Sequence, residues 1–580
     1  MKNRFSSALL TLLLVALLLP AFVLGQQKRD QTPGPTGTST VPGRPAPGVG
    51  VAPRRNTRPR VTNEATATVE QDFSEALTVI QENYIDGKKL DYNNVFKSSI
   101  IGMLRSLDPH SNYYDKEEFD DMKTDQRSEY FGIGASIQNY TVGDQTDTFV
   151  AATFQNSPAA RAGLRFGDRI DQVDGIKMRG KGSLEVRDKI RGPRGTLVKI
   201  TVARASNGKA ETVEITRDAV PQPSVPDAYL IRPGVGYIDM RHGFNYTTAD
   251  ELQEKLEALH AQGMTSLVLD LRDNPGGFLD QAIRVAAAFL PRGKLILTQK
   301  GRNGRNDHVY ESPNNDPDQT PLVILVNENT ASASEIVAGA VQDHDRGLIV
   351  GQTSFGKGLV QSIIPLDYGA GLTLTSAKYF TPSGRLIQRD YSNGGFYDYY
   401  TRGGTIRMEQ KEPEAKPTGP ESRTDTGRPV YGGGGITPDE AVKQTTLTLT
   451  QNRLRHPMFF FTRDLVNGRI PGFDKYRVDR PIEFGHNLQP ADFPITEPLV
   501  KAFRDFVAKE PSWKTLVPQI DRNRAYVENQ LRWDIVTVAY GSVTALQVLV
   551  KEDPQVAKAV EVVPRARELA MTASRARSQP

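Results

Sequence analysis

Thr330-Ala331-Ser332-Ala333-Ser334-Glu335-Ile336 follows the apolar run Pro321–Val326 in this chain. The apolar run has the length of a buried strand, and the residues after it fit the start of a helix. Ser332 stands at the N-cap position with Glu335 three residues on, which is the pattern of a capping box. The same position suits a nucleophile, because the backbone N–H groups of a first helical turn stabilise negative charge that develops there.

The residues around this stretch alternate between strand and helix patterns. Strands are predicted at Gly236–Met240 and Ser266–Leu271, and helices from Thr248 and over Phe278–Leu290. The first of these helices carries an apolar stripe at helical spacing. Such alternation predicts an α/β core, which we place at residues 220–443.

A second stretch, Thr353–Gln361, contains a candidate base, Lys357. A serine hydroxyl needs a base because it is barely ionised near neutral pH. A lysine can act as that base if burial lowers its pKa from about 10.4 by roughly three units, at a cost of about 4 kcal/mol. In an extended chain Lys357, Leu359 and Gln361 lie on one side, so we expect Gln361 to orient the amine or the hydroxyl.

A glycine turn, Arg272-Asp273-Asn274-Pro275-Gly276-Gly277, follows the strand that ends at Leu271. Glycine leaves the backbone bare, so a substrate carbonyl can approach the N–H of Gly276 or Gly277 closely. An ordinary strand-to-helix turn is the alternative interpretation.

The run Gly351–Lys357 also matches the phosphate-loop pattern G-x-x-x-x-G-K. A phosphate loop needs Ser or Thr after the lysine for Mg²⁺ and leads into a helix. This chain has Gly358 there, and a strand pattern follows. An NTPase is therefore the weakest of the functional hypotheses.

Two histidines offer other chemistry. His344 lies between Asp343 and Asp345, and we expect it in solvent at a helix end. Asp108-Pro109-His110 holds the residues of a catalytic pair, but a histidine after proline is more typical of a turn. Asp343 follows Ser332 on the same predicted helix, and a structural role is expected for it.

Residues 127–219 form a β-rich segment with one short helix, Ser157–Leu164, and a turn–strand–turn pattern at Gly167–Gly175. These residues resemble a PDZ domain of the bacterial protease type. Such domains bind a peptide C-terminus by adding it as a strand. Tyr130–Gly134 resembles the carboxylate-binding loop, which assigns that role to Phe131, Gly132, Ile133 and Gly134. A structural β-domain without a ligand is the alternative.

The N-terminal residues 1–25 have the pattern of an export signal. Lys2 and Arg4 precede a nearly unbroken apolar run, Ala8–Leu19, and small or apolar residues follow at Val23–Gly25. The segment is predicted to be a signal peptide or an N-terminal anchor. Either outcome exports the chain to the periplasm or to the outer face of the cytoplasmic membrane.

A linker is predicted at residues 26–62, which are rich in Pro, Gly and Thr and too polar to repay ordering by burial. It ends in a basic run, Arg54–Arg60, which is compatible with membrane-surface association through anionic headgroups or with a solvated linker. Residues 63–126 read as an N-terminal helical region. Residues 444–580 read as a helical extension, compatible with a homodimer contact or an adaptor site.

The bulk composition excludes several classes of protein. The 580 residues are 38% hydrophobic and 24% charged, so most of the chain can bury cores. Its 72 basic and 68 acidic residues are too balanced to predict a nucleic-acid partner. The absence of cysteine excludes disulfides, thiolate metal sites and a cysteine nucleophile. No histidine pair has metal-ligand spacing, so neither a metal nor another cofactor is predicted.

The stretches above resemble the C-terminal processing peptidases, or tail-specific proteases, of the S41 serine peptidase family. The resemblance covers about residues 63–443. It rests on the PDZ-like segment and on five short runs: Leu107–Ser111, Arg272–Gly277, Thr330–Ile336, Phe355–Gln361 and Gly435–Asp439.

The resemblance implies a crotonase/ClpP-like α/β core with an inserted PDZ domain that recognises substrate C-termini and gates the site. It implies that Ser332 is the nucleophile, Lys357 the base and Gln361 its support. The backbone of Ala333 and of the Gly276–Gly277 turn would form the oxyanion hole.

The sequence therefore predicts an exported serine endopeptidase that cuts proteins or peptides near apolar C-terminal tails. The alternative is a non-catalytic PDZ scaffold that only binds C-termini. The presence of both Ser332 and Lys357 argues against the scaffold.

Overall fold

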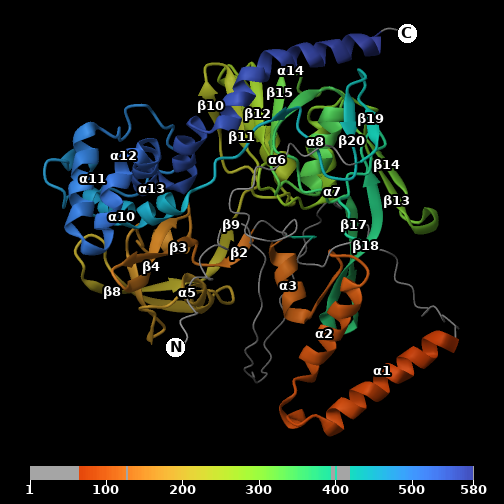
Figure 1. Cartoon of the computed structure of the whole chain (residues 1–580), viewed down its shortest axis with the longest axis horizontal. Helices are drawn as coiled ribbons and strands as arrows, with labels where there is room; N and C mark the ends of the chain where they lie inside the picture. Colours follow the sequence, from red (N-terminus) through yellow and green to blue (C-terminus); the bar gives the residue numbers. More distant parts are fainter. Residues whose placement is uncertain (1–63, 126–128, 393–398, 401–418, 579–580) are drawn as a thin grey trace, which may run out of the picture. The chain divides into compact units, whose positions relative to one another are not determined.

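The computed structural model describes residues 64–125, 129–392, 399–400 and 419–578 (Figure 1). The predicted export signal at residues 1–25 and the whole of the predicted linker at residues 26–62 lie outside these residues. The chain separates into two compact units, Met1–Met103 and Leu104–Pro580, which are described one at a time.

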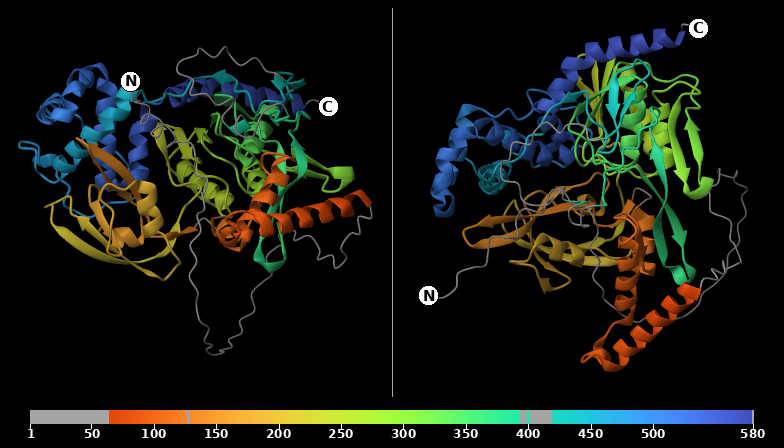
Figure 2. Two further views of the ribbon diagram at one scale, coloured as in Figure 1. Left: turned by 60° about the horizontal axis from the view of Figure 1, so that its bottom comes forward. Right: turned by 45° about the vertical axis from the view of Figure 1, so that its right-hand side comes forward.

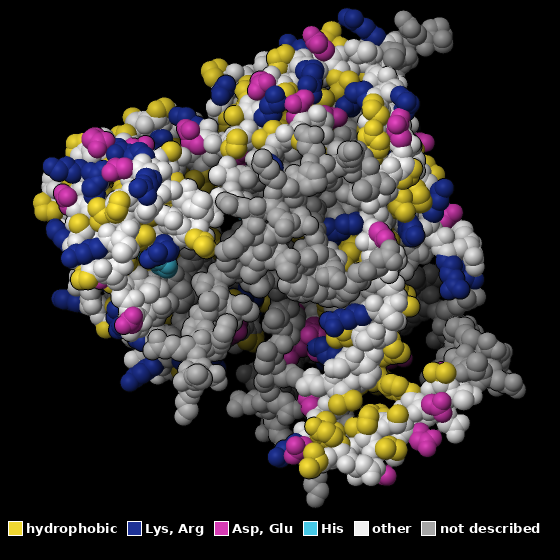
Figure 3. Space-filling model, viewed as in Figure 1, with side chains coloured by type: hydrophobic (Ala, Val, Ile, Leu, Met, Phe, Trp, Pro, Cys, Tyr) yellow, Lys and Arg dark blue, Asp and Glu magenta, His cyan; other side chains and the backbone are white. Residues whose placement is uncertain are grey.

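In the first unit, the described residues form helices. They are α1 (Glu64–Asn83), the 3-10 turn η1 (Gly87–Lys89) and most of α2 (Tyr92–Arg105). Apolar side chains such as Val69, Phe73 and Ile80 are exposed on α1. Figure 3 shows hydrophobic side chains gathered along this helix.

The core of the second unit is a six-stranded sheet in the order β10-β11-β12-β15-β16-β21. All neighbouring pairs are parallel except β10 with β11. The strands are β10 (Ala228–Arg232), β11 (Val235–Asp239), β12 (Ser266–Asp270), β15 (Leu322–Val326), β16 (Gly347–Gly351) and β21 (Glu440–Ala441).

Both faces of this sheet are covered, as a parallel sheet requires. One face packs against α6 (Thr248–Ala261), α7 (Leu279–Ala287) and α8 (Ala333–Asp343). The other face packs against α14 (Pro554–Ser578), with Val556, Ala559 and Val562 buried on it. In Figures 1 and 2, α14 runs along the sheet on this side. The C-terminal extension therefore completes the core.

A second sheet is antiparallel and carries the strand that follows Lys357. Its order is β1-β18-β13-β14, with β17 also paired to β18. The strands are β1 (Asn112–Tyr114), β13 (Leu295–Gly301), β14 (His308–Glu311), β17 (Leu359–Pro365) and β18 (Gly371–Phe380). A separate hairpin joins β19 (Glu421–Arg423) and β20 (Pro429–Tyr431). The helix α3 (Lys116–Asp125) precedes the PDZ-like segment.

The PDZ-like segment forms its own sheet, β3-β4-β5-β7-β8, with β6 paired to β5, around a separate apolar core. The strands are β3 (Ala135–Val142), β4 (Gln145–Thr153), β5 (Arg169–Val173), β6 (Ile176–Lys177), β7 (Leu197–Ala203) and β8 (Ala210–Thr216). The helices are α4 (Pro158–Arg161) and α5 (Ser183–Ile190). The strands β2 (Glu129–Gly132) and β9 (Asp218–Pro221) pair where the chain enters and leaves the segment.

The rest of the C-terminal extension is a helical region that packs against the PDZ-like sheet. Its main helices are α10 (Leu449–Val466), α11 (Glu497–Lys509), α12 (Val517–Arg522) and α13 (Arg524–Lys551). The rings of Tyr140, Phe149 and Phe166 contact Phe459 of α10. α13 has the length and apolar content of a membrane span, but 61% of its apolar window is buried, as in a core helix.

The run Ile436-Thr437-Pro438-Asp439-Glu440 has the pattern of a helix start, but this prediction is wrong, because Glu440 and Ala441 form β21 and add a parallel strand beside β16. The expectation for His344 is also wrong. His344 is not in solvent. It is buried, with its ring nitrogens 3.0 Å from Asp425 Oδ2 and 2.7 Å from Leu295 O. His344 is the C-terminal cap of α8, and it contacts Asp425 in the turn between β19 and β20. The local sequence gives no signal of this distant contact.

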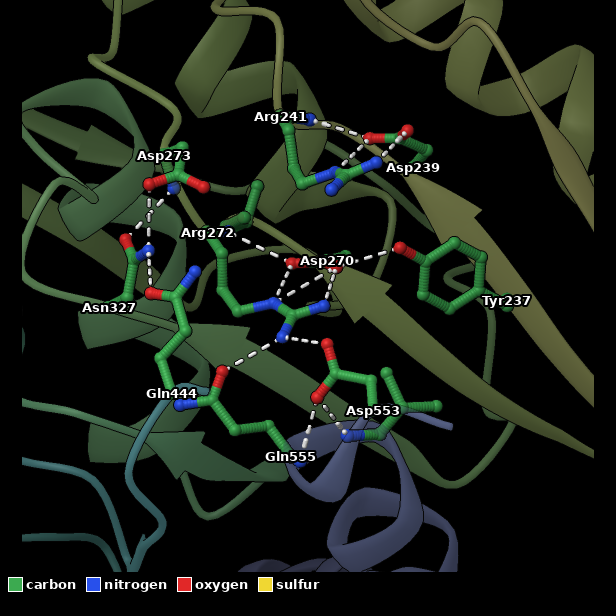
Figure 4. A network of polar contacts seen from close by, with 12 residues as sticks. Tyr237, Asp239, Arg241, Asp270, Arg272, Asp273, Asn327, Gln444, Asp553 and Gln555 are labelled. Atoms are coloured by element: carbon green, nitrogen blue, oxygen red, sulfur yellow. Dashed lines mark hydrogen bonds and ion pairs between the residues drawn. The ribbon is translucent and has the colours of Figure 1, made fainter. Parts of the chain in front are cut away.

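A buried polar network fastens α14 to the core sheet (Figure 4). The Arg272 guanidinium donates to both carboxylate oxygens of Asp270, and also to Asp553 at 2.6 Å and Gln555 at 2.8 Å. Tyr237 donates to Asp270 from the neighbouring strand. Burial acts to raise the pKa of Asp270, but Arg272 holds that pKa below its ordinary value.

We predict that Arg272→Met destabilises the core by about 3–5 kcal/mol, because it leaves the Asp270 carboxylate buried without its partner. Urea unfolding followed by circular dichroism measures the change. The matched control is Arg565→Met, which removes an exposed arginine that pairs with Glu440 and should cost less than about 1 kcal/mol. Equal losses in the two variants would show that the buried network does not hold α14.

Candidate active site

Ser332 lies at the junction of a buried strand and a buried helix. It is the N-cap of α8, as the sequence predicts, and it is half-buried. Its backbone has φ 56° and ψ −115°, whereas an ordinary N-cap is extended. A non-glycine residue at positive φ is held only by its surroundings and is common at functional sites.

Hydrogen bonds on both sides of the turn hold this conformation. Thr330 Oγ1 donates to Leu271 O at 2.8 Å, and Thr330 N donates to Asn327 O at 2.9 Å. Ala331 N donates to Asn274 O at 2.9 Å, which ties the turn to the Arg272–Gly277 segment. The two stretches predicted to form the site therefore meet through their backbones.

Gly276 lies directly against the nucleophile candidate. Its φ is 91°, and a Cβ added to it would lie 2.7 Å from Ser332 Cβ and 2.8 Å from Ala333 N. The Gly276 N–H donates to Asn274 Oδ1 at 2.9 Å, so it is not free for a substrate. Among the described residues, none accepts from the N–H of Gly277 or Ala333. Those two groups are the available donors for an oxyanion.

The Glu335 carboxylate joins the serine stretch to the lysine stretch. Oε2 accepts from Ser332 N at 2.8 Å and from Lys357 N at 2.9 Å. Oε1 accepts from Gly356 N at 2.7 Å and from the Ser354 hydroxyl. The backbone nitrogens of Ser332 and Lys357 thus lie within two hydrogen-bond lengths of each other. The predicted capping residue of α8 is also the residue that positions Lys357.

A second bridge comes from Tyr379 on β18. Its hydroxyl donates to Lys357 O at 2.7 Å and lies 3.1 Å from Ser332 O. Burial, and then the charge of Glu335, raise the pKa of Tyr379 well above its ordinary value, so the hydroxyl keeps its proton. Tyr379 could not be predicted from the sequence as a site residue, because an aromatic residue on a strand carries no local signal of this contact.

Lys357 has a depressed pKa. The residue is half-buried overall, but its ammonium is desolvated, and this lowers its pKa to about 8. The negative charges of Glu335 and Asp108 raise the pKa of Lys357 and so prevent a larger fall in that pKa. A lysine with a pKa near 8 is partly neutral near neutral pH, so it can accept a proton.

Gln361 lies on β17, but Lys357 precedes the strand, which begins at Leu359. The expected strand alternation therefore covers Leu359 and Gln361 and does not extend to Lys357. Gln361 Nε2 donates to Thr375 Oγ1 at 3.2 Å, and the Thr375 side chain is hydrogen-bonded to Asp108. The structure thus connects Gln361 to the surroundings of Lys357 through Thr375.

The Asp108–Ser111 segment is a turn, as expected, and it lies beside Lys357. The Asp108 carboxylate accepts from the N–H groups of His110 and Ser111, both at 2.8 Å, and from the Ser111 hydroxyl. Burial acts to raise the pKa of Asp108, but these bonds outweigh it and the pKa lies below its ordinary value. The turn reaches the site because β1, which follows it, pairs with β18.

His110 is neutral and does not form a pair with Asp108. Its Nε2 lies 2.9 Å from the Tyr399 hydroxyl, and its Nδ1 lies 3.2 Å from the Tyr400 hydroxyl. Burial, and then the charge of Lys357, lower its pKa to about 3. His110 therefore supports the site as an uncharged ring.

The segment predicted to bind a carboxylate divides into two parts. Phe131 and Gly132 belong to β2, whereas Ile133 and Gly134 form a turn into β3. Gly134 has φ 72°, and a Cβ there would lie 2.3 Å from Ser157 Cβ. Within the described chain, the N–H groups of Ile133 and Gly134 donate to no other residue. These two groups are the ones available to a peptide carboxylate.

Comparison with known proteins gives two family matches. The model of peptidase family S41 matches residues 234–394, and the model of the PDZ domain matches residues 150–204. Residues 444–580 lie outside both. A carboxy-terminal-processing protease of Bartonella bacilliformis is 39% identical over 305 residues, which cover 51% of this chain and 68% of that protein.

Other relatives have similar names. A probable CtpA-like serine protease of Staphylococcus aureus is 36% identical over 307 residues, covering 52% of this chain and 59% of that protein. Carboxy-terminal processing protease CtpA of Bacillus subtilis is 33% identical over 318 residues, covering 55% and 66%. Among solved structures, a photosystem II D1 C-terminal processing protease is 29% identical, covers 54% of this chain and 88% of that chain, and has a TM-score of 0.32.

We predict that Gly276→Ala lowers the rate at which a fluorophosphonate probe labels Ser332 by at least about 10²-fold, because the new methyl group displaces Ser332 and Ala333. Labelling is measured per folded molecule. The matched control is Gly263→Ala at φ 85°, where nothing lies within 4 Å of the added Cβ. Similar labelling in both variants would contradict the close packing of Gly276 on Ser332.

Proposed function

Because this chain belongs to peptidase family S41 and is a serine-type peptidase, we propose that it is an exported endopeptidase that cleaves proteins near their C-terminal tails with Ser332 and Lys357. One observation carries the proposal. The Glu335 carboxylate accepts from both Ser332 N and Lys357 N, and the lysine held there has a pKa of about 8.

The proposed reaction begins when the neutral Lys357 amine removes the proton of the Ser332 hydroxyl. The Ser332 oxygen adds to the scissile carbonyl, and the resulting oxyanion is stabilised by the N–H groups of Ala333 and Gly277. The lysine passes its proton to the leaving amine as the C–N bond breaks. A water molecule then hydrolyses the acyl-enzyme, with Lys357 again accepting and returning a proton.

The supporting residues act on the charge and position of Lys357. Gln361, through Thr375, holds the Asp108 carboxylate, whose charge partly opposes the desolvation of the amine. The fold proposed for the core is of the crotonase/ClpP type. The buried parallel sheet and the helices α6, α7 and α8 on one face support this assignment.

The PDZ domain is proposed to select substrates by their C-termini. The carboxylate would be bound by the N–H groups of Ile133 and Gly134. The partly buried side chains of Ala135 and Ile137, packed on the domain's apolar core, support a preference for apolar tails. Export to the periplasm or to the outer face of the cytoplasmic membrane is proposed from the sequence alone, as are membrane-surface association and dimer or adaptor contacts.

We predict that Ser332→Ala and Lys357→Ala each reduce cleavage of a reporter with an apolar C-terminal tail by at least about 10³-fold. Cleavage is followed by gel and mass spectrometry. Lys378→Ala is the matched control, because Lys378 is an exposed lysine on the neighbouring strand β18, and its rate should match the parent. Tail binding without turnover in the unmutated chain would instead favour a non-catalytic scaffold.

We also predict that kcat/KM rises with pH through an apparent pKa of about 8 and then levels off. The sign follows from the base: below this pKa Lys357 is an ammonium and cannot accept the serine proton, and above it the amine is free. Initial rates with the reporter, measured from about pH 6 to about pH 10, test the profile. A rate that is independent of pH over this range would exclude Lys357 as the base.

A further inference from the structure

The strand β3 is at the edge of the PDZ sheet. One side of it pairs with β4, and in the described residues no strand pairs with its other side. The turn at Ile133 and Gly134, proposed to bind the peptide carboxylate, comes directly before the strand. A peptide bound there runs antiparallel to β3, with its C-terminus at Gly134 and its upstream residues toward Val142.

A side chain from the C-terminal helical region occupies the upstream end of this edge. Thr141 N donates a hydrogen bond to Nδ1 of His456, at 3.2 Å. His456 belongs to α10, which lies beside β3 in Figure 1 and is far from it in sequence. A strand N–H that already has a partner cannot pair with an added strand. The free edge therefore ends before Thr141.

The imidazole is fixed in this place by its neighbours. The ring of Phe459, on the same helix, stacks on Tyr140 of β3 with centroids 3.6 Å apart and planes 6° apart. Arg455 Nη2 donates to Gln138 Oε1 at 3.0 Å. Burial lowers the pKa of His456, so the ring is neutral and Nδ1 can accept. α10 is thus anchored to β3 on both sides of His456, by the hydrogen bond of Arg455 before it and by the stacking of Phe459 after it.

The side chain of Asn139, two residues before Thr141, ties β3 to the start of α5. The Asn139 side chain accepts from Ser183 N, the first residue of α5, at 2.6 Å, and donates to Lys181 O at 3.2 Å. Beyond Val142, Gly143 N donates to the Ser512 hydroxyl of the helical region at 3.2 Å. Contacts from two directions therefore close the upstream end of the edge.

We propose that His456 is a specificity-determining residue that sets how many residues of a substrate tail the PDZ domain reads. A tail pairs with β3 only along Ala135–Asn139, which admits about the last five residues of the substrate. Residues further upstream leave the edge at His456 and add nothing to binding. This inference rests on the proposed recognition of C-termini by the PDZ domain.

The test uses the full chain with Ser332→Ala, which binds tails without cutting them. Fluorescein-labelled peptides of about three to nine residues, all ending in the same apolar sequence, are titrated by fluorescence anisotropy. We expect the affinity to rise with length up to about five residues and then to stay constant. An additional His456→Ala change should free Thr141 N–H and raise the affinity of the longest peptides about fivefold, the effect of roughly one added hydrogen bond.

Two matched variants test whether the effect comes from the loss of the hydrogen-bond acceptor Nδ1 of His456 or from the loss of a histidine in general. His456→Asn keeps an acceptor near the position of Nδ1 and should restore the parent length limit. His308→Ala removes an exposed histidine on β14 and should leave the length dependence unchanged. Amide exchange gives a second readout: Thr141 should be protected without peptide in the parent and should lose that protection in His456→Ala.

The outcomes distinguish this inference from the proposed function. Affinity that keeps rising beyond about five residues in the parent, or a His456→Ala variant with the parent length limit, overturns the role of His456 and leaves tail recognition intact. Peptides that fail to bind at every length overturn PDZ recognition of tails and this inference together, even if Ser332 still cleaves the reporter.

Discussion

The Glu335 carboxylate is the constraint on which the site depends. It is fully buried and accepts four donors, among them the backbone N–H groups of Ser332 and Lys357. Burying a carboxylate away from water costs free energy unless its oxygens accept hydrogen bonds. The four donors together compensate for this cost, so the loss of one would leave the buried charge only partly compensated. The same contacts that offset this cost fix the proposed nucleophile, Ser332, and the proposed base, Lys357, relative to each other. Stability and reactivity at this site therefore have one origin.

The C-terminal extension packs against both the core sheet and the PDZ sheet of the second unit. α14 covers a face of the core sheet that would otherwise expose a row of apolar side chains, and Arg272 fastens it through Asp553 and Gln555. α10 and α13 pack against the PDZ sheet and place His456 at its edge. One continuous segment thus supports the protease core with its last helix and shapes the proposed peptide groove with its first. The same segment therefore contributes to core stability and to the proposed recognition of substrates.

Local features of the site were predictable from the sequence, and features that depend on distant contacts were not. The capping role of Glu335 follows from its spacing to the serine, because a helix cap is made within one turn. Its bond to Lys357 N depends on how the lysine loop returns to α8, which no local pattern encodes. The position of Asp108 beside Lys357 depends on a strand pairing across the chain. The α/β alternation predicted the sheet, but nothing near Asp553 indicated that it binds Arg272.

Direct titration of the Lys357 amine tests the account most simply. Lysine carrying a side-chain isotope label, in the Ser332→Ala chain and again with Glu335→Gln, reports the charge of the amine by nuclear magnetic resonance. We expect a pKa of about 8 in the first protein and a lower pKa in the second, because the Glu335 charge raises the lysine pKa. An amine that stays charged up to its ordinary pKa of about 10.4 would contradict the account.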